Sequence, residues 1–418
     1  MSRSRAWLGG GRGYVVVMRL GTRLLSPLTI PLAFALTGCP DDGDDDGDEG
    51  APASEDGAVD ESGGPTTGDD DDDDDGTADG GSTDGGSGGS DGGTADETDG
   101  GSGDSGGGST GEEACGPAVE LGSYTPEDGD ARGMAIDGDT LYLAVTSAGL
   151  EIVDVTDAAA ATRLGGVDFD TGELAQTVVY ADGYAYVGQR GSGWVIVDVS
   201  DPADPMTISA DDSDDAEDVA IDGTVFFVLD SDGIRTYDVT DAASPSELSP
   251  QVVFPGSSES FALAGDHAYI AAQSTALVVA DVSDASAPTE AGTWDADGNG
   301  GSVAVGDGVV YVSHSEGLAV IDVSDPANPT ELGTYVRDNL GDVAVVDGVA
   351  YVLGGDTATT EVPTLAVIDL SDPANPIELD TSFDDYDDPA HILVSDGRVF
   401  ISVEDDDSVH VLDPCPPA

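Results

Sequence analysis

The side chains that could do chemistry in this chain are mostly carboxylates, and few of their usual catalytic or metal-binding partners accompany them. The sequence holds 86 acidic residues against 11 basic ones, with 4 histidines and 3 cysteines. His267 is expected in a turn, His314 in a loop and His410 in a strand. None of them has the spacing of a metal site, and no Ser-His-Asp or Cys-His set is visible.

One acidic segment has oxygen ligands at a spacing that suits calcium. Asp295, Asp297 and Asn299 alternate with small residues and are followed by Gly300. Ca²⁺ binds several oxygens in such a turn, although the later bidentate glutamate of a full calcium loop is missing here. Calcium is the one cofactor that the sequence suggests. The alternative reading, in which the acidity serves solubility, stays open.

The rest of the acidity belongs to a repeat. An apolar run that stops at an aspartate and turns, as in Leu318 to Asp322, recurs along the chain. The successive aspartates are 44, 40, 43, 41, 47 and 44 residues apart, at positions Asp154, Asp198, Asp238, Asp281, Asp322, Asp369 and Asp413. Aspartate at the entry of a tight turn accepts backbone N–H bonds, so these residues are interpreted as structural.

Each repeat is expected to fold as four antiparallel strands. An apolar strand leads into an Asp-Gly turn such as Asp347-Gly348, which is a strong hairpin signal. The second strand carries one core aromatic in each unit: Tyr142, Tyr186, Phe227, Tyr269, Tyr311, Tyr351 and Phe400. No helical periodicity appears. A period in the forties with strand units predicts an all-β, seven-bladed β-propeller.

The third strands, such as Val195-Ile196-Val197-Asp198, resemble those of the LVIVD-repeat family. The resemblance extends over all seven units and rests on the aspartate that ends the strand and the Ser/Thr-Asp that follows. It implies a propeller on an exported or surface protein.

The seventh unit lacks a fourth strand, and the N-terminal side of the repeats supplies a matching one. Residues 117–124 resemble residues 329–335, so a strand from the N-terminus is expected to complete the last blade and close the ring. Cys115 and Cys415 flank this strand and its partner. In an exported protein they are predicted to form a disulfide.

The start of each first strand is expected at the mouth of a central channel, on the face where propellers usually bind ligands. This placement gives the candidate ligand-binding set Arg132, Gln176, Glu217, Asp218, Glu259, Asp342 and His391. A solvated channel lining explains the same residues without any ligand.

The N-terminal 38 residues have the pattern of an export signal, in which Arg19 and Arg23 precede an apolar segment that ends at Cys39. Leu36-Thr37-Gly38-Cys39 resembles the lipobox of bacterial lipoproteins, which implies cleavage before Cys39 and attachment of fatty acyl chains to it. Pro40 after the cysteine favours the outer membrane by the sorting rules of that class. The translation start is Met1 or Met18.

The domains are predicted as a signal peptide (1–38), a disordered tether (39–114) and the propeller (115–418). Residues 40–113 contain 27 acidic residues and no aromatic ones. Such a segment cannot bury enough apolar surface to fold, so it would hold the propeller away from the membrane.

The function expected from these features is binding, at the cell envelope, of a protein or a glycan by a lipid-anchored monomer without catalytic activity. The alternative is a calcium-assisted hydrolase or lyase acting at the channel mouth. The lack of a convergent catalytic set favours the first over an enzyme. A net charge of −75 excludes nucleic acid as a partner, because phosphates need clustered cations.

Overall fold

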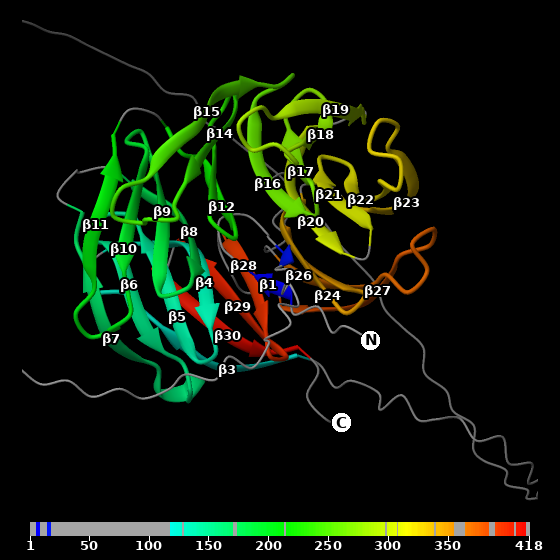
Figure 1. Ribbon diagram of the computed structural model, residues 1–418. Coiled ribbons are helices and arrows are strands. Elements are labelled where there is room, and N and C mark those ends of the chain that lie inside the picture. Colours follow the sequence, from blue (N-terminus) through cyan, green and yellow to red (C-terminus); the bar gives the residue numbers. More distant parts are fainter. Residues whose placement is uncertain are drawn as a thin grey trace, which may run out of the picture. The chain divides into compact units, whose positions relative to one another are not determined.

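Seven four-stranded antiparallel sheets follow one another around a ring (Figure 1). The protein is described here from a computed structural model. The residues whose structure is described are 6–8, 15–17, 118–127, 129–169, 174–212, 215–296, 299–306, 308–337, 340–354, 364–383, 389–404 and 407–414. The fold is an all-β, seven-bladed propeller, as the repeat predicts.

The first four blades take their strands in chain order. Blade 1 is β4 (Ala131–Asp137), β5 (Thr140–Val145), β6 (Gly149–Asp154) and β7 (Thr162–Val167). Blade 2 is β8 (Leu174–Ala181), β9 (Tyr184–Arg190), β10 (Trp194–Asp198) and β11 (Met206–Asp211). Blade 3 is β12 (Asp218–Asp222), β13 (Val225–Leu229), β14 (Gly233–Asp238) and β15 (Ser246–Val253). Blade 4 is β16 (Ser258–Ala264), β17 (His267–Ala272), β18 (Ala276–Asp281) and β19 (Thr289–Trp294).

The last three blades follow the same plan, except that the final strand of the ring comes from the other end of the chain. Blade 5 is β20 (Gly300–Gly306), β21 (Val309–His314), β22 (Gly317–Asp322) and β23 (Thr330–Val336). Blade 6 is β24 (Leu340–Val346), β25 (Val349–Gly354), β26 (Thr364–Asp369) and β27 (Ile377–Phe383). Blade 7 is β28 (Pro389–Ser395), β29 (Arg398–Val403), β30 (Ser408–Asp413) and β3 (Val119–Tyr124).

Outside the blades, a 3-10 turn η1 (Ala158–Ala160) precedes β7, and a short antiparallel pair, β1 (Ala6–Leu8) and β2 (Val15–Val17), lies in the segment interpreted above as a signal peptide. The tether, Cys39, Cys115 and Cys415 lie outside the described residues. No helix in the described part of the chain has the length and hydropathy needed to cross a bilayer.

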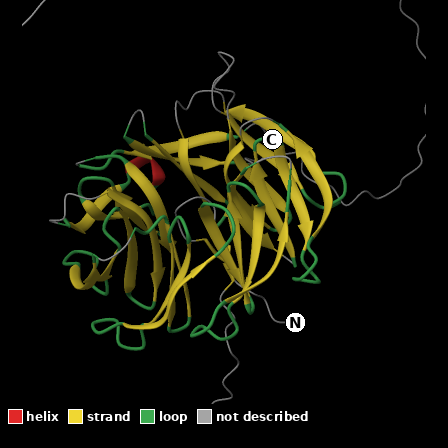
Figure 2. Ribbon diagram, turned by 90° about the horizontal axis from the view of Figure 1, so that it is seen from above, coloured by secondary structure: helices red, strands yellow, loops and turns green. Residues whose placement is uncertain are grey.

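The hairpins form where the sequence places Asp-Gly. Asp347 and Gly348 have φ values of 51° and 80°, so both central residues of this turn adopt the left-handed conformation. Two such residues in succession give the turn whose twist matches that of paired strands, and glycine adopts this conformation without steric cost. The first strands of neighbouring blades then contact one another, as β4 does with β8 and β16 with β20 (Figure 1). Figure 2, turned by 90°, shows that the blades consist almost entirely of strands joined by short loops.

The hydrophobic core lies between the blades. The largest cluster joins blades 6, 7 and 1 and includes Leu353, Phe400 and Met134. The aromatic residue of each second strand packs in these layers, and Tyr142 stacks on Tyr180 of the next blade with ring centroids 4.7 Å apart. Burial raises the pKa of Tyr186 to about 12, as expected for a phenol in an apolar layer.

The closure between blades 7 and 1 also carries polar contacts. Arg398 donates to the carbonyl of Val155 at 2.7 Å and to Asp139 at 2.8 Å, and its guanidinium lies 5.4 Å from the ring centre of Phe400. Strand β3 continues the seam, because the hydroxyl of Tyr124 donates to Glu151 in blade 1. The last blade is therefore bound to the first at several places along its length.

The repeated aspartates accept backbone N–H bonds, as predicted. In six blades the carboxylate at the end of the third strand accepts from the N–H two residues later at 2.8–3.0 Å, in the pairs Asp154–Thr156, Asp198–Ser200, Asp238–Thr240, Asp281–Ser283, Asp322–Ser324 and Asp369–Ser371. Each carboxylate holds the entry of a turn in its folded conformation.

These turns predict a pH dependence of stability. The hydroxyl and backbone N–H of Thr240 lower the pKa of Asp238 below its usual 3.8. The unfolded chain therefore takes up this proton at higher pH than the folded chain, so the stabilisation is present above about pH 4 and is lost as pH falls through the folded pKa. We expect Asp238→Ala to be less stable than wild type at pH 6, with the gap shrinking toward pH 3. Urea unfolding at both pH values measures it, and a gap that stays constant would contradict the assignment.

Candidate functional site

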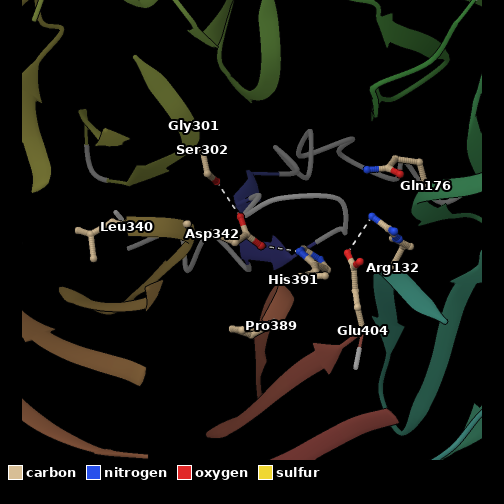
Figure 3. Close-up of a pocket in the computed structure, with 11 residues that line it drawn as sticks. Arg132, Gln176, Gly301, Ser302, Leu340, Asp342, Pro389, His391 and Glu404 are labelled. Carbon is tan, nitrogen blue, oxygen red and sulfur yellow. Dashed lines mark hydrogen bonds and ion pairs between the residues drawn. The ribbon is translucent and has the colours of Figure 1, made fainter. Parts of the chain in front are cut away.

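A cavity of about 270 Å³ opens at one end of the central channel. Figure 3 shows its lining, which comes from the first strands of blades 1, 2, 5, 6 and 7 and from the turn after β29. The lining residues are Arg132, Gln176, Gly301, Ser302, Leu340, Gly341, Asp342, Pro389, Ala390, His391 and Glu404.

The cavity is off-centre because equivalent positions in the seven blades differ in size. In each first strand, one residue pairs with the core aromatic of the second strand. The residue three positions before it is, in blade order, Arg132, Gln176, Glu217, Glu259, Gly301, Gly341 and Ala390. Blades 1 to 4 therefore place long polar side chains at this level. Blades 5 to 7 place almost nothing there, and the space that they leave is the cavity.

A β-bulge explains why these side chains differ from their neighbours. The pairing of the first and second strands slips at this level in six blades, for example between Ala175 and Thr177 and between Gly300 and Ser302. The extra residue of a bulge is unpaired and takes a direction of its own, which is how bulges aim side chains at functional sites. Gln176 and Gly301 are such extra residues.

The residue after each position of that series is buried in every blade, and in all but blade 1, which has Gly133, it is polar. These polar residues form a belt: Thr177, Asp218, Ser260, Ser302, Asp342 and His391. Asp342 accepts from the hydroxyl of Ser302 at 2.7 Å and from the N–H of Ile392 at 2.9 Å, and its other contact is to Nδ1 of His391 at 2.5 Å. One carboxylate thus joins blades 5, 6 and 7.

Asp218 does the same in blades 2, 3 and 4. It accepts from the hydroxyl of Thr177 at 3.1 Å and from the N–H of Phe261 at 3.1 Å. The carboxylates of Asp218 and Asp342 both form hydrogen bonds between blades. We therefore interpret Asp342, with its partner His391, as a structural floor of the cavity. The side chains of His391 and Asp342 are only 2% and 1% exposed.

The wall of the cavity is formed by an ion pair across the ring closure. Arg132 of blade 1 lies 2.7 Å from Glu404 of blade 7, and both side chains are 25% exposed. Nε of Arg132 is buried without a hydrogen-bond partner in the described structure. Nε–H of Arg132 can therefore donate a further hydrogen bond, and the neighbouring carboxylate of Glu404 can accept hydrogen bonds. The side-chain amide of Gln176 can do both.

The cavity brings together four of the seven residues expected at the channel mouth, Arg132, Gln176, Asp342 and His391. Asp218 is in the belt instead, Glu217 pairs with Arg190 at 3.4 Å, and Glu259 accepts from Gln273. Glu404 and the glycines were missed as site residues. The glycines could have been found by aligning the seven units at the bulge.

The remaining expectations have separate outcomes. Asp295 and Asn299 are exposed, while Asp297 lies outside the described residues, and no group of three metal-binding side chains occurs in the part that is described. His314 was expected in a loop, but it ends strand β21 and is buried against Trp294. The loop reading was wrong because the second strand of blade 5 runs longer than its apolar pattern. Burial lowers the pKa of His314.

The model of the LVIVD repeat matches the chain at residues 128–168, 173–210, 255–296, 297–337 and 340–384. These stretches correspond to blades 1, 2, 4, 5 and 6. The resemblance was expected over all seven units, and the repeat model matches five of them. No curated protein is significantly similar to the chain in sequence.

Solved propellers share the fold at low sequence identity. The WD40 domain of Pan2 from Neurospora crassa is 11% identical, with a TM-score of 0.54, over 73% of this chain and 97% of that one. BamB from Moraxella catarrhalis is 11% identical, with a TM-score of 0.50, over 71% and 99%. The computationally designed protein Ika8 is 10% identical, with a TM-score of 0.50, over 70% and 98%.

The belt predicts a large effect of removing its carboxylate. Asp342→Ala would leave the Ser302 hydroxyl and the N–H groups of Val343 and Ile392 buried without an acceptor. We expect a loss of about 3 kcal/mol of unfolding free energy, against about 1 kcal/mol for Ser302→Ala, which removes one bond. Urea unfolding compares the two variants. Equal losses would show that Asp342 does not join the blades.

Proposed function

We propose that this seven-bladed propeller of LVIVD repeats is a binding protein of the cell envelope that takes part of a protein or glycan ligand into its channel mouth. The observation that carries the proposal is the one-sided cavity between Arg132, Gln176 and Glu404 and the small residues of blades 5 to 7. Arg132 and Gln176 come from bulges in the first strands of blades 1 and 2, and Glu404 comes from the turn after β29.

The volume of the cavity sets the size of what it would take. Small-molecule sites usually enclose about 300–1,000 Å³, and this cavity encloses about 270 Å³. That is room for one sugar ring or one long side chain. The proposed ligand is therefore a larger molecule that inserts a single group.

The charges favour a neutral or basic group. Arg132 is already paired with Glu404, and the protein carries a net charge of −75, so its long-range field repels anions. The unpartnered Nε of Arg132 and the amide of Gln176 supply donors, while Glu404 supplies an acceptor. Hydroxyl groups of a sugar or a polar side chain of a peptide match this set.

The proposal includes closure of the ring by β3 and by a bond between Cys115 and Cys415. Val119 pairs with Asp413 in the β3–β30 register, so the chain leads toward both cysteines from adjoining strand ends. The bond would constrain the unfolded chain over a loop of about 300 residues, which is worth about 6 kcal/mol in the chain-entropy treatment. Peptide mapping without reductant checks it, and free thiols in exported protein would refute it.

Filling the cavity should abolish binding without unfolding the protein. A Cβ at Gly341 would come no nearer than 3.5 Å to the carbonyl oxygen of Leu353, which is an ordinary contact. We expect Gly341→Gln to keep its melting temperature and to bind any ligand found on a glycan and peptide array at least about tenfold more weakly. Glu290→Gln, on the exposed outer strand of blade 4, is the matched control. Unchanged binding by the filled variant would place the ligand elsewhere.

The proposed anchor is a lipid on Cys39, and it is supported by the Leu36 to Cys39 motif behind a charged and then apolar segment. In a bacterial host, Cys39→Ser should lose incorporation of labelled fatty acid and leave the membrane fraction. The propeller's melting temperature should stay the same, because residue 39 lies far outside the blades in sequence. A variant that stays in the membrane without acyl label would disprove the anchor.

A further inference from the structure

A second polar constellation lies on the two outermost strands of blade 7, away from the residues that line the channel cavity. The hydroxyl of Ser408 is 2.8 Å from Nε2 of His410, and Nδ1 of His410 is 2.9 Å from the carboxylate of Glu120. Ser408 and His410 are two residues apart on β30, so they share one face of the strand. Glu120 comes from β3, which pairs with β30.

The protonation of this chain of contacts follows from the carboxylate. A carboxylate only accepts hydrogen bonds, so Nδ1 of His410 must carry the proton that is shared with Glu120. Nε2 is then the unprotonated nitrogen, and it accepts from the hydroxyl of Ser408. This is the order of a serine, a base and an orienting acid, at distances within the 2.6–3.2 Å range that proton transfer requires.

Blade 7 departs from the other blades at both strand positions. Five residues before the turn aspartate, the blades carry in order Gly149, Gly193, Gly233, Ala276, Gly317, Thr364 and Ser408. Three residues before it, they carry Glu151, Val195, Arg235, Val278, Ala319, Ala366 and His410. A glycine or small residue followed by a mostly apolar one suits the fold, so the repeat does not require this serine and histidine. Departures of this kind are where repeat proteins place function.

We propose that Ser408 is a nucleophile that attacks small acyl esters, with His410 as its general base and Glu120 as the residue that positions His410. In the first step the Ser408 hydroxyl proton moves to Nε2, the oxygen bonds to the acyl carbon, and the alcohol leaves with the proton from His410. Water then attacks the acyl-serine with His410 again as the base. Carboxylic acid is released and Ser408 regains its proton.

The surroundings limit the substrate to a small and uncharged acyl group. Ser408 is 4% exposed and the His410 side chain 12% exposed, so the hydroxyl lies just beneath the surface. Asp407, next to Ser408, is exposed and has a φ of 54°, which marks the sharp turn into β30. Asp407 and Glu120 make the entrance acidic, and an anionic acyl group would be repelled there.

The test is labelling by an uncharged fluorophosphonate, which bonds covalently to activated serines. We expect peptide mass spectrometry to find the label on Ser408 of the full chain, and Ser408→Ala to abolish it. Ser123→Ala is the matched control, because Ser123 is exposed on β3 directly opposite His410 and should not change labelling. His410→Gln should slow labelling at least about 100-fold, the scale of a lost general base.

The role of Glu120 is tested by a measurement that would not change if Glu120 only held β3 against β30. Glu120→Gln should displace the pH profile of the labelling rate, and Glu120→Asp should restore it in part, with melting temperatures recorded for every variant. An unlabelled Ser408 in folded wild-type protein would overturn the proposal, as would labelling that survives His410→Gln in a folded variant. In that case the three residues only fasten β3 to β30. Either outcome leaves the channel-mouth binding proposal untouched.

Discussion

Docking of blade 7 against blade 1 is the constraint on which the rest of this structure depends. A propeller without that contact is an open stack with exposed edges, and the largest apolar cluster of the described protein lies where the contact is made. The polar contacts of Arg398 with Val155 and Asp139 reinforce the same seam. Both sites discussed above straddle or adjoin it. Arg132 and Glu404 face each other across the closure, and Glu120 belongs to the strand that completes blade 7.

Placing function at a seam has a physical logic in a repeat protein. Within the array, each blade packs against a neighbour built on the same repeat, so packing between the blades constrains its side chains. Blade 7 keeps the repeat but combines strands from both ends of the chain. Its residues His391, Glu404, Ser408 and His410 differ from their equivalents in most other blades, while the backbone hydrogen bonds that pair the strands of blade 7 are kept.

Much of the fold could be read from the sequence, because its signals are local. The aromatic of each second strand and the aspartate that ends each third strand lie within one unit and repeat seven times, and the Asp-Gly turn repeats six times. The channel-mouth set was partly found for the same reason, since it needs only the start of each first strand. What local pattern could not supply was the direction of each side chain. The β-bulge separates Gln176, which faces the cavity, from Thr177, which is buried beside it.

The side-chain contacts between residues far apart in the sequence could not be read from the pattern within one unit. His410 and Glu120 are 290 residues apart, and Asp342 and His391 are 49 apart. For the first pair, matching residues 117–124 to the missing fourth strand predicted that β3 lies beside β30, but not the register of the two strands. A register shift between Glu120 and Gly122 places Ser123 opposite His410, so the contact of His410 with Glu120 could not be read from that match alone.

The few arginines of the propeller show how an acidic chain uses scarce cations. Arg132 and Arg398 form ion pairs across the closure, and Arg163 lies 3.0 Å from Glu151, the carboxylate that also accepts from Tyr124 of β3. These ion pairs are only partly exposed to solvent, and they act at the same seam as the largest apolar cluster. They neutralise carboxylates where blades 7 and 1 come together. Without them, that seam would bring like charges into contact in a protein whose net charge is −75.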